Sequence, residues 1–143
     1  MRPKDTQQRI PLKARIGTSQ PKLIEAVTLM ETNIEEPLSP DDLAYHVGLS
    51  RRHLERLFKK HLDSVPSRFY LQLRLDKARQ MLRDTDRSIV EVGMACGFSS
   101  ASHFSTTYRT HFNVTPRQER GRATHVESAP SWNHSVVIQR RLD

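Results

Sequence analysis

A run of basic residues between positions 51 and 61 is the part of the sequence best suited to bind an anionic partner. Leu54, Leu57 and Phe58 repeat at helical spacing, so a helix here would bury them on one face and turn the charged residues outward. Arginine can donate two hydrogen bonds to a guanine edge, and lysine or arginine can neutralise a phosphate. Five cations against one carboxylate, Glu55, give the run a formal charge of +4; they are Arg51, Arg52, Arg56, Lys59 and Lys60.

A basic helix face is also compatible with ordinary solvation, so its meaning depends on the elements that hold it. Ser39 followed by Pro40 predicts the start of a preceding helix, Gly48 predicts its end, and Ser50 can cap the basic helix. A helix, a glycine turn and a second helix are typical of a helix-turn-helix unit. Such a unit projects its second helix into the major groove of DNA.

The sequence contains this unit twice. Gly48 matches Gly97 at an offset of 49 residues, and Leu54 matches Phe104 at an offset of 50. One extra residue in the second turn accounts for the difference. We expect both glycines to adopt the left-handed conformation that ends a helix. The alternative, helical hairpins that only pack, leaves the basic face of the first unit unexplained.

The remaining apolar periodicity is helical, and no strand alternation competes with it. We therefore predict an all-α fold of about seven helices, with two helix-turn-helix subdomains joined by a long linker helix. The predicted helices cover about 21–35, 40–47, 51–61, 66–82, 88–95, 100–111 and 116–122. The predicted domains are a basic linker (1–20), the first subdomain with the linker helix (21–83), the second subdomain (84–122) and a flexible C-terminal tail (123–143).

Composition and missing motifs exclude several classes of protein. The 143 residues carry a formal charge of +7 and a single cysteine, Cys96, which we expect to be a packed apolar thiol. No apolar run approaches the roughly 20 residues that span a bilayer. The histidines lack zinc spacing, and no glycine-rich phosphate loop or nucleophile motif occurs. We expect a cytoplasmic protein that is not an enzyme and uses neither metal nor cofactor.

Residues 21–120 resemble the DNA-binding domain of AraC/XylS-type transcription regulators. The resemblance rests on Leu43-Ala44, Gly48-Leu49-Ser50, Leu54-Glu55-Arg56-Leu57-Phe58, Arg74-Leu75, Ala78-Arg79, Cys96-Gly97-Phe98-Ser99-Ser100, His103-Phe104-Ser105, Tyr108-Arg109 and Thr115-Pro116-Arg117. Residues 8–12, 30–31 and 35–39 are similar to one branch, whose members carry an N-terminal amidase-like (PfpI-type) sensor domain and include arginine, carnitine and glycine-betaine regulators.

The resemblance implies that two recognition helices enter successive major grooves about 34 Å apart. It also implies that a sensor domain is missing here, that residues 1–20 are an inter-domain linker, and that a small-molecule effector acts only through that missing domain. A stand-alone short regulator is the alternative. The sequence departs from the family pattern at Asp63 and Asn113, which stand in place of glycine, and at Val65, which cannot cap. Gly93 is the counterpart of Ala44, at a position where we expect two helices to cross closely. It replaces the commoner alanine, which predicts a looser helix.

The resemblance also assigns base-contacting roles by position. In the first unit we expect Arg52, Glu55 and Arg56 to face base edges, although an ion pair that orients Arg51, Arg52 or Lys59 is the alternative role for Glu55. The matching positions of the second unit hold short, uncharged side chains, so we expect the first unit to supply most sequence discrimination. Those positions are Ala101, Ser102, Ser105 and Thr106.

A second group of residues is expected to contact phosphates. We predict that Ser39, Ser50 and Ser99 cap helices whose amide ends attract anions, and that His103 is half-buried. The full set of predicted phosphate contacts is Ser39, Ser50, Arg51, Lys59, Lys60, Arg68, Ser99 and Arg109.

These features favour a sequence-specific transcription regulator, with activation preferred over repression. Its expected partners are double-stranded promoter or operator DNA on the nucleoid and RNA polymerase, and it has no expected contact with a membrane. The alternative is a regulator fragment that acts mainly as an interaction module for RNA polymerase or a partner protein, with weak DNA specificity. A general nucleic-acid binder is a third possibility, but no exposed ladder of aromatic residues supports it.

Overall fold

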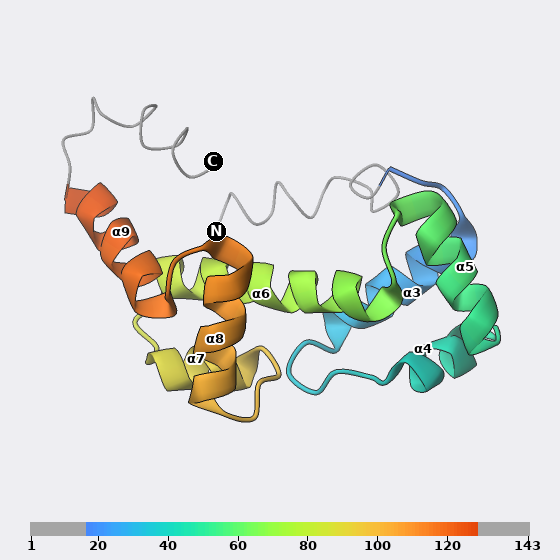
Figure 1. Ribbon diagram of the computed structural model, residues 1–143, viewed down its shortest axis with the longest axis horizontal. Helices are drawn as coiled ribbons and strands as arrows, with labels where there is room; N and C mark the ends of the chain where they lie inside the picture. Colours follow the sequence, from blue (N-terminus) through green and yellow to red (C-terminus); the bar gives the residue numbers. More distant parts are fainter. Residues whose placement is uncertain (1–16, 129–143) are drawn as a thin grey trace. The chain divides into compact units, whose positions relative to one another are not determined.

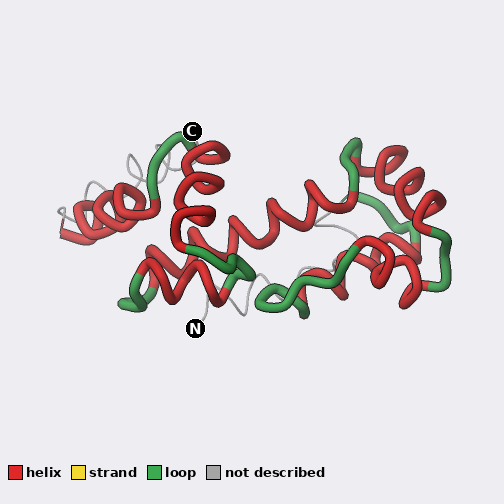
Figure 2. Tube along the Cα trace, turned by 60° about the horizontal axis from the view of Figure 1, so that its bottom comes forward, coloured by secondary structure: helices red, strands yellow, loops and turns green. Residues whose placement is uncertain are grey.

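The computed structural model describes residues 17–128, and its regular structure within that range is entirely helical (Figures 1 and 2). The all-α prediction and the predicted number of helices are confirmed for these residues. None of the described helices has the length and apolar character needed to cross a bilayer. The seven helices are α3 (Pro21–Thr32), α4 (Pro40–Val47), α5 (Arg51–Leu62), α6 (Pro66–Asp84), α7 (Ile89–Ala95), α8 (Ala101–Phe112) and α9 (Pro116–Ser128).

Two helix ends differ clearly from the prediction. The first helix stops at Thr32 rather than near 35, because Asn33 ends it. The Asn33 side chain donates to the Leu29 carbonyl at 2.8 Å, and its backbone N–H donates to the Met30 carbonyl. At the other end, α9 continues to Ser128 instead of ending near 122. Most of the predicted linker (1–16) and of the predicted tail (129–143) lies outside the described residues.

The chain divides into two compact units between Arg74 and Leu75, inside α6. We call these unit 1 (residues up to 74) and unit 2 (residues from 75). The sequence-based division assigned the whole of this helix to the first subdomain, whereas each compact unit contains part of it.

Unit 1 encloses a core built by three short helices and the start of α6. Its buried side chains include Leu23 and Met30 of α3, with Leu54 and Phe58 of α5, all fully inaccessible to solvent. Tyr70 of α6 ties this core to the loop between α3 and α4. Its hydroxyl donates to the Asn33 carbonyl and accepts the Leu38 N–H at 3.0 Å.

Unit 2 has an aromatic core. The Phe104 ring lies 5.1 Å from the Phe98 ring and 5.8 Å from the Tyr108 ring, and Phe104 is fully buried. Gly93 of α7 is packed directly against it. A Cβ at this position would lie 2.8 Å from Cδ2 and 3.2 Å from Cβ of Phe104. The expected close crossing of the two helices is therefore present, and it explains Gly93 better than the predicted loosening of α7 does.

Candidate nucleic-acid interface

The first helix-turn-helix of the repeat is built as the sequence predicts. The Ser39 hydroxyl accepts the Asp42 N–H at 3.0 Å and starts α4, while Gly48 ends that helix at a φ of 76°. The Ser50 hydroxyl then accepts the His53 N–H at 3.0 Å and starts α5. Since a positive φ costs glycine least, Gly48 allows the sharp turn that separates the two helices. These contacts set the direction in which α5 leaves the turn.

The two recognition helices present their side chains in the same way. Residues 51–62 and 101–112 show an identical succession of exposed, half-buried and buried side chains. Leu54 and Phe104 occupy the same buried position, so the sequence repeat is also a structural repeat. The candidate base-contacting residues lie outside both cores. Arg52, Arg56, Ala101, Ser102 and Thr106 are exposed, and Glu55 and Ser105 are half-buried.

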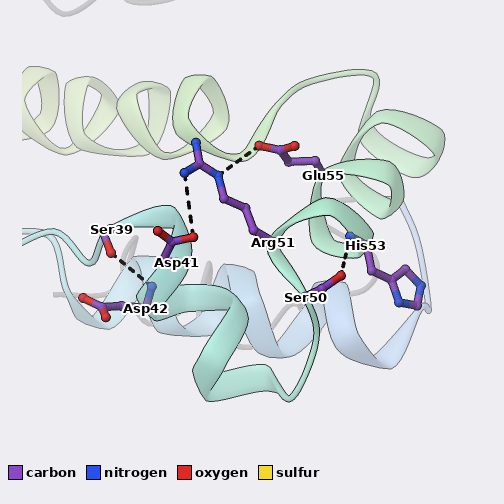
Figure 3. A network of polar contacts seen from close by, with 7 residues as sticks. All are labelled: Ser39, Asp41, Asp42, Ser50, Arg51, His53 and Glu55. Atoms are coloured by element: carbon purple, nitrogen blue, oxygen red, sulfur yellow. Dashed lines mark hydrogen bonds and ion pairs between the residues drawn. The ribbon is translucent and has the colours of Figure 1, made fainter.

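Arg51 lies between two carboxylates at the start of the first recognition helix (Figure 3). Its Nη1 is 3.7 Å from Oδ1 of Asp41 on α4, and its Nε is 3.3 Å from Oε2 of Glu55 on α5. The structure therefore contains the ion pair that was the alternative role for Glu55. These contacts link the two helices of the motif and direct the Arg51 guanidinium toward acidic side chains of its own unit.

The other cations of α5 differ in their partners. Lys59 pairs with Asp63 at 3.2 Å, and both side chains are largely exposed. Among the described residues, no carboxylate pairs with Arg52, Arg56 or Lys60, and all three are exposed. Exposed ion pairs contribute only about 0–1 kcal/mol, so even Lys59 can exchange its carboxylate for a phosphate at little cost. The outer face of α5 can thus offer several cations to an anionic partner.

The second helix-turn-helix has the same caps and glycine turn as the first, but one of its caps differs from the prediction. Ser88 and Glu91 form the reciprocal cap that starts α7, and Gly97 has a φ of 89°. Ser100, not Ser99, caps α8, since its hydroxyl accepts the His103 N–H at 3.0 Å. The extra residue in the second turn explains the error, because it makes Ser100 the counterpart of Ser50. The prediction of a capping role for Ser99 was wrong.

His103 also differs from its predicted environment. It is exposed rather than half-buried, and its ring lies 5.6 Å from the Phe98 ring. The other predicted phosphate contacts of the helical surface, Arg68 of α6 and Arg109 of α8, are exposed as required. Cys96 is fully buried, as expected for a packed thiol.

Both recognition helices end in a left-handed residue. Asp63 has a φ of 51° and Asn113 a φ of 65°. Their backbone N–H groups donate to the carbonyls of Lys59 at 3.1 Å and Arg109 at 2.7 Å. Asp and Asn tolerate this conformation better than most residues, so both turns form without glycine.

Sequence reasoning missed a buried carboxylate in unit 2. Glu119 of α9 is fully inaccessible to solvent. The Tyr108 hydroxyl donates to its Oε1 at 2.9 Å, and Arg83 of α6 contacts its Oε2 at 2.8 Å. Burial by itself raises the pKa of Glu119, but the Tyr108 hydrogen bond and the charges of Arg83 and Arg79 outweigh it and hold the pKa below its ordinary value. Burial and the negative charge of Glu119 raise the pKa of Tyr108.

One signal in the sequence could have identified Glu119. The offset of 50 that relates Phe58 to Tyr108 also relates Phe69 to Glu119. In unit 1, Phe69 packs against the core, and its ring lies 5.7 Å from the Phe58 ring. Extending the repeat past the recognition helix would have placed Glu119 at a core position beside a tyrosine.

Comparison with known proteins finds relatives that cover both helix-turn-helix units. A helix-turn-helix domain family matches residues 43–122. The HTH-type transcriptional regulator ArgR of Pseudomonas aeruginosa is 61% identical over 113 residues, which make up 79% of this chain and 34% of ArgR. The chain therefore spans about a third of the length of that relative.

Solved structures share the fold. A transcriptional regulator from Chromobacterium violaceum, described as having an AraC-type DNA-binding domain, superposes with a TM-score of 0.71 at 68% identity, over 73% of this chain and 94% of that one. The DNA-binding domain of AdpA in complex with a target DNA gives a TM-score of 0.67 at 27% identity, over 70% of this chain and 90% of that one. The matched family, the identity to ArgR and these structures agree with the resemblance drawn from the motifs, and this chain belongs to the AraC-type family of helix-turn-helix transcriptional regulators.

Proposed function

We propose that this chain regulates transcription by binding double-stranded DNA at a specific sequence, with α5 and α8 in successive major grooves. The observation that carries the proposal is the outer face of α5. Arg52 and Arg56 are exposed there without a carboxylate partner among the described residues, on a helix whose cap and turn belong to a helix-turn-helix. The DNA-binding domain of AdpA, which shares this fold, is solved in complex with a target DNA, and this supports DNA as the partner.

Base recognition divides unequally between the two helices in this proposal. Arg52 and Arg56 can each donate two hydrogen bonds to guanine, and a free oxygen of Glu55 can accept from cytosine while Arg51 holds the other. The second helix contacts bases through small or hydroxyl side chains, which discriminate weakly by themselves. These side chains are Ala101, Ser102, Ser105 and Thr106.

Phosphate contacts position the protein on DNA. Lys60, Arg68 and Arg109 are exposed cations suited to this role, and Lys59 can join them by leaving Asp63. The N-terminal amides of α4 and α5, behind Ser39 and Ser50, add partial positive charge. Arg51 reaches a phosphate only if it leaves its two carboxylates, so we assign it mainly to holding α4 and α5 together.

The decisive experiment is selection of DNA from a random duplex pool by the purified chain at near-physiological salt. Two enriched blocks about one helical turn apart are expected. Binding without enrichment would reject sequence-specific recognition.

Two substitutions then separate base contacts from phosphate contacts. Arg56→Ala should cost about 1–3 kcal/mol on the selected site and relax one base position, whereas Lys60→Ala should weaken all sequences alike and lower the salt slope by about one. An equal loss on every sequence for Arg56→Ala would remove it from the base-contacting set.

A second candidate function is contact with RNA polymerase or another partner protein. Val90 and Met94 favour it, because they lie one turn apart on α7 with 51% and 60% of their surfaces exposed. The two functions are compatible, and we propose polymerase contact as the route to activation. DNA binding unchanged by Met94→Ala with reduced activation in a reporter assay is the expected result.

The remaining parts of the proposal concern the whole protein. Relatives are transcriptional regulators rather than enzymes, so we propose that the chain has no catalytic activity and acts on the nucleoid in the cytoplasm. We further propose that a small-molecule effector acts through an N-terminal sensor domain. The ligand response of a longer chain carrying such a domain would test this.

A further inference from the structure

We infer that Glu119 is a positioning residue for the second recognition helix, because its buried carboxylate joins α8 to α6 and so fixes how α8 is presented. The inference rests on the proposed function in one respect, which is that α8 reads DNA. All of the groups involved belong to unit 2.

The two carboxylate oxygens of Glu119 are held from different helices. Arg83 of α6 contacts Oε2 through both Nε and Nη2 at 2.8 Å. Tyr108 of α8 donates to Oε1 at 2.9 Å, and Nε of Arg79 lies 3.4 Å from the same oxygen. One side chain of α9 therefore connects the recognition helix to the helix beneath it.

Neighbouring contacts reinforce both connections. Arg120, the next residue of α9, donates to the carbonyls of Leu82 and Thr85 at 3.1 and 3.2 Å, so α9 is anchored to the C-terminal end of α6. The Arg79 guanidinium carbon lies 4.8 Å from the centre of the Phe112 ring at the end of α8. Glu119 thus acts from a helix that is itself held in place.

The repeat shows that this arrangement is particular to unit 2. At the matching positions of unit 1, Phe58 and Phe69 make an edge-to-face ring contact. Two rings tolerate small sliding movements, whereas hydrogen bonds to a buried carboxylate lose strength steeply when their geometry changes. The second recognition helix is therefore held by a hydrogen bond that depends on geometry, whereas the first is held by a ring contact that tolerates movement.

The short side chains on the surface of α8 explain why the position of this helix must be fixed by the Tyr108–Glu119 hydrogen bond. Its candidate base-contacting side chains are short, so they reach base edges only when the helix backbone is accurately placed. In unit 1, the long side chains of Arg52 and Arg56 can adjust to small errors in helix position. The helix whose candidate base-contacting side chains are short and uncharged therefore needs the more rigid support, and Glu119 with Tyr108 supplies it.

The test compares two tyrosine substitutions in the full chain. Tyr108→Phe removes only the hydroxyl that joins α8 to Glu119. Tyr70→Phe is the matched control, because it removes a buried tyrosine hydroxyl from unit 1 that contacts the loop at Asn33 and Leu38 and no recognition helix. Affinities are measured for the selected DNA and for versions altered in either block, at a temperature at which circular dichroism shows both variants fully folded.

The expected result is a selective one. Tyr108→Phe should reduce discrimination in the block read by α8 about three- to tenfold, as expected for one hydrogen bond, and leave the block read by α5 unchanged. Tyr70→Phe should leave discrimination in the α8 block unchanged. Amide signals of α8 in the NMR spectrum of the free protein should shift in Tyr108→Phe only.

Each contrary outcome has a distinct meaning. Full discrimination in the α8 block by Tyr108→Phe, or an equal loss in both blocks, would overturn the positioning role. A wild-type chain that shows no discrimination in the α8 block would instead refute the proposed reading of DNA by α8. Failure of the proposed DNA reading would be visible in the wild-type chain before any substitution is made. It is therefore distinguishable from failure of the positioning role.

Discussion

Replacement of Gly93 by alanine is expected to destabilise unit 2, although alanine is the better helix former. Its higher helix propensity would contribute about 1 kcal/mol in favour of the variant. Against this, the new methyl group would lie 2.8 Å from Cδ2 and 3.2 Å from Cβ of Phe104. The ring cannot swing away freely, because it is fully buried and packed against Phe98 and Tyr108.

The contact with Cβ decides the magnitude. A clash with a ring edge can be relieved by a side-chain rotation, but relief at Cβ requires α7 and α8 to move apart. We therefore take the upper part of the range for overpacking, about 2–3 kcal/mol. Subtracting the gain in propensity leaves unit 2 less stable by about 1–2 kcal/mol, a fall in melting temperature of about 5–10 °C for a domain of this size.

The assay is thermal unfolding followed by circular dichroism, with Phe104→Leu as the partner substitution. The repeat supplies the rationale, since Ala44 and Leu54 occupy the matching positions of unit 1. The double variant Gly93→Ala with Phe104→Leu should lose about 1–2 kcal/mol less free energy of unfolding than the two single losses added together. A single Gly93→Ala variant that unfolds at or above the wild-type temperature would refute the steric explanation.

Three further predictions concern the ends of helices and the buried carboxylate. Asn113→Gly should stabilise unit 2 by about 0.5–1 kcal/mol, because glycine adopts the left-handed conformation of this residue more easily, and an unchanged urea midpoint would contradict this. Ser100→Ala should cost about 1 kcal/mol through loss of the α8 cap whereas Ser99→Ala should not, and the reverse order in the same denaturation assay would reject the assigned cap. The pKa of Glu119 in the folded protein lies below its ordinary 4.5, so the unfolded state takes up the proton first as the pH falls. The stability that Glu119 contributes through Tyr108, Arg83 and Arg79 is therefore fully present above about pH 4.5 and is lost below it. Urea unfolding between pH 3 and 7 should show this loss for the wild type and a flatter profile for Glu119→Gln, and equal profiles would refute it.

Local signals were sufficient to predict most of the fold. Capping serines, prolines at first helical positions and glycines after the last turn determine where a helix can begin and end, and Ser39, Ser50 and Gly48 act as their types predict. Apolar spacing identified the buried residues of both recognition helices. The same spacing determines the opposite face, so it also predicted which residues of these helices lie outside the core.

Two features were missed because they depend on a partner in another helix. At Gly93 the sequence indicated a close helix crossing, but it could not show that the ring of Phe104 occupies the space where a Cβ would lie. Glu119 was not singled out in the sequence, because its partners come from α6 and α8. Neither contact has a local signature, because each is made across helices.

The internal repeat contains the long-range information that single positions lack, provided that its positions are read in pairs. Ala44 with Leu54 becomes Gly93 with Phe104, so that a smaller residue on one helix accompanies a larger one on the other.

Two other pairs change together in the same way. The ring contact of Phe58 with Phe69 becomes the hydrogen bond of Tyr108 with Glu119. At the surface, Asp41 and Arg51 form an ion pair in unit 1. The matching positions of unit 2 hold Val90 and Ala101, which are both exposed and uncharged. A change at either member alone would leave an overfilled core, a buried charge without a partner or an exposed charge without its counter-ion. The paired changes avoid these penalties and leave two units with one backbone plan but different surfaces. We propose that one unit exchanges the carboxylate partners of its cations for phosphate, whereas the other presents short, uncharged side chains on a helix that the buried Glu119 holds in place.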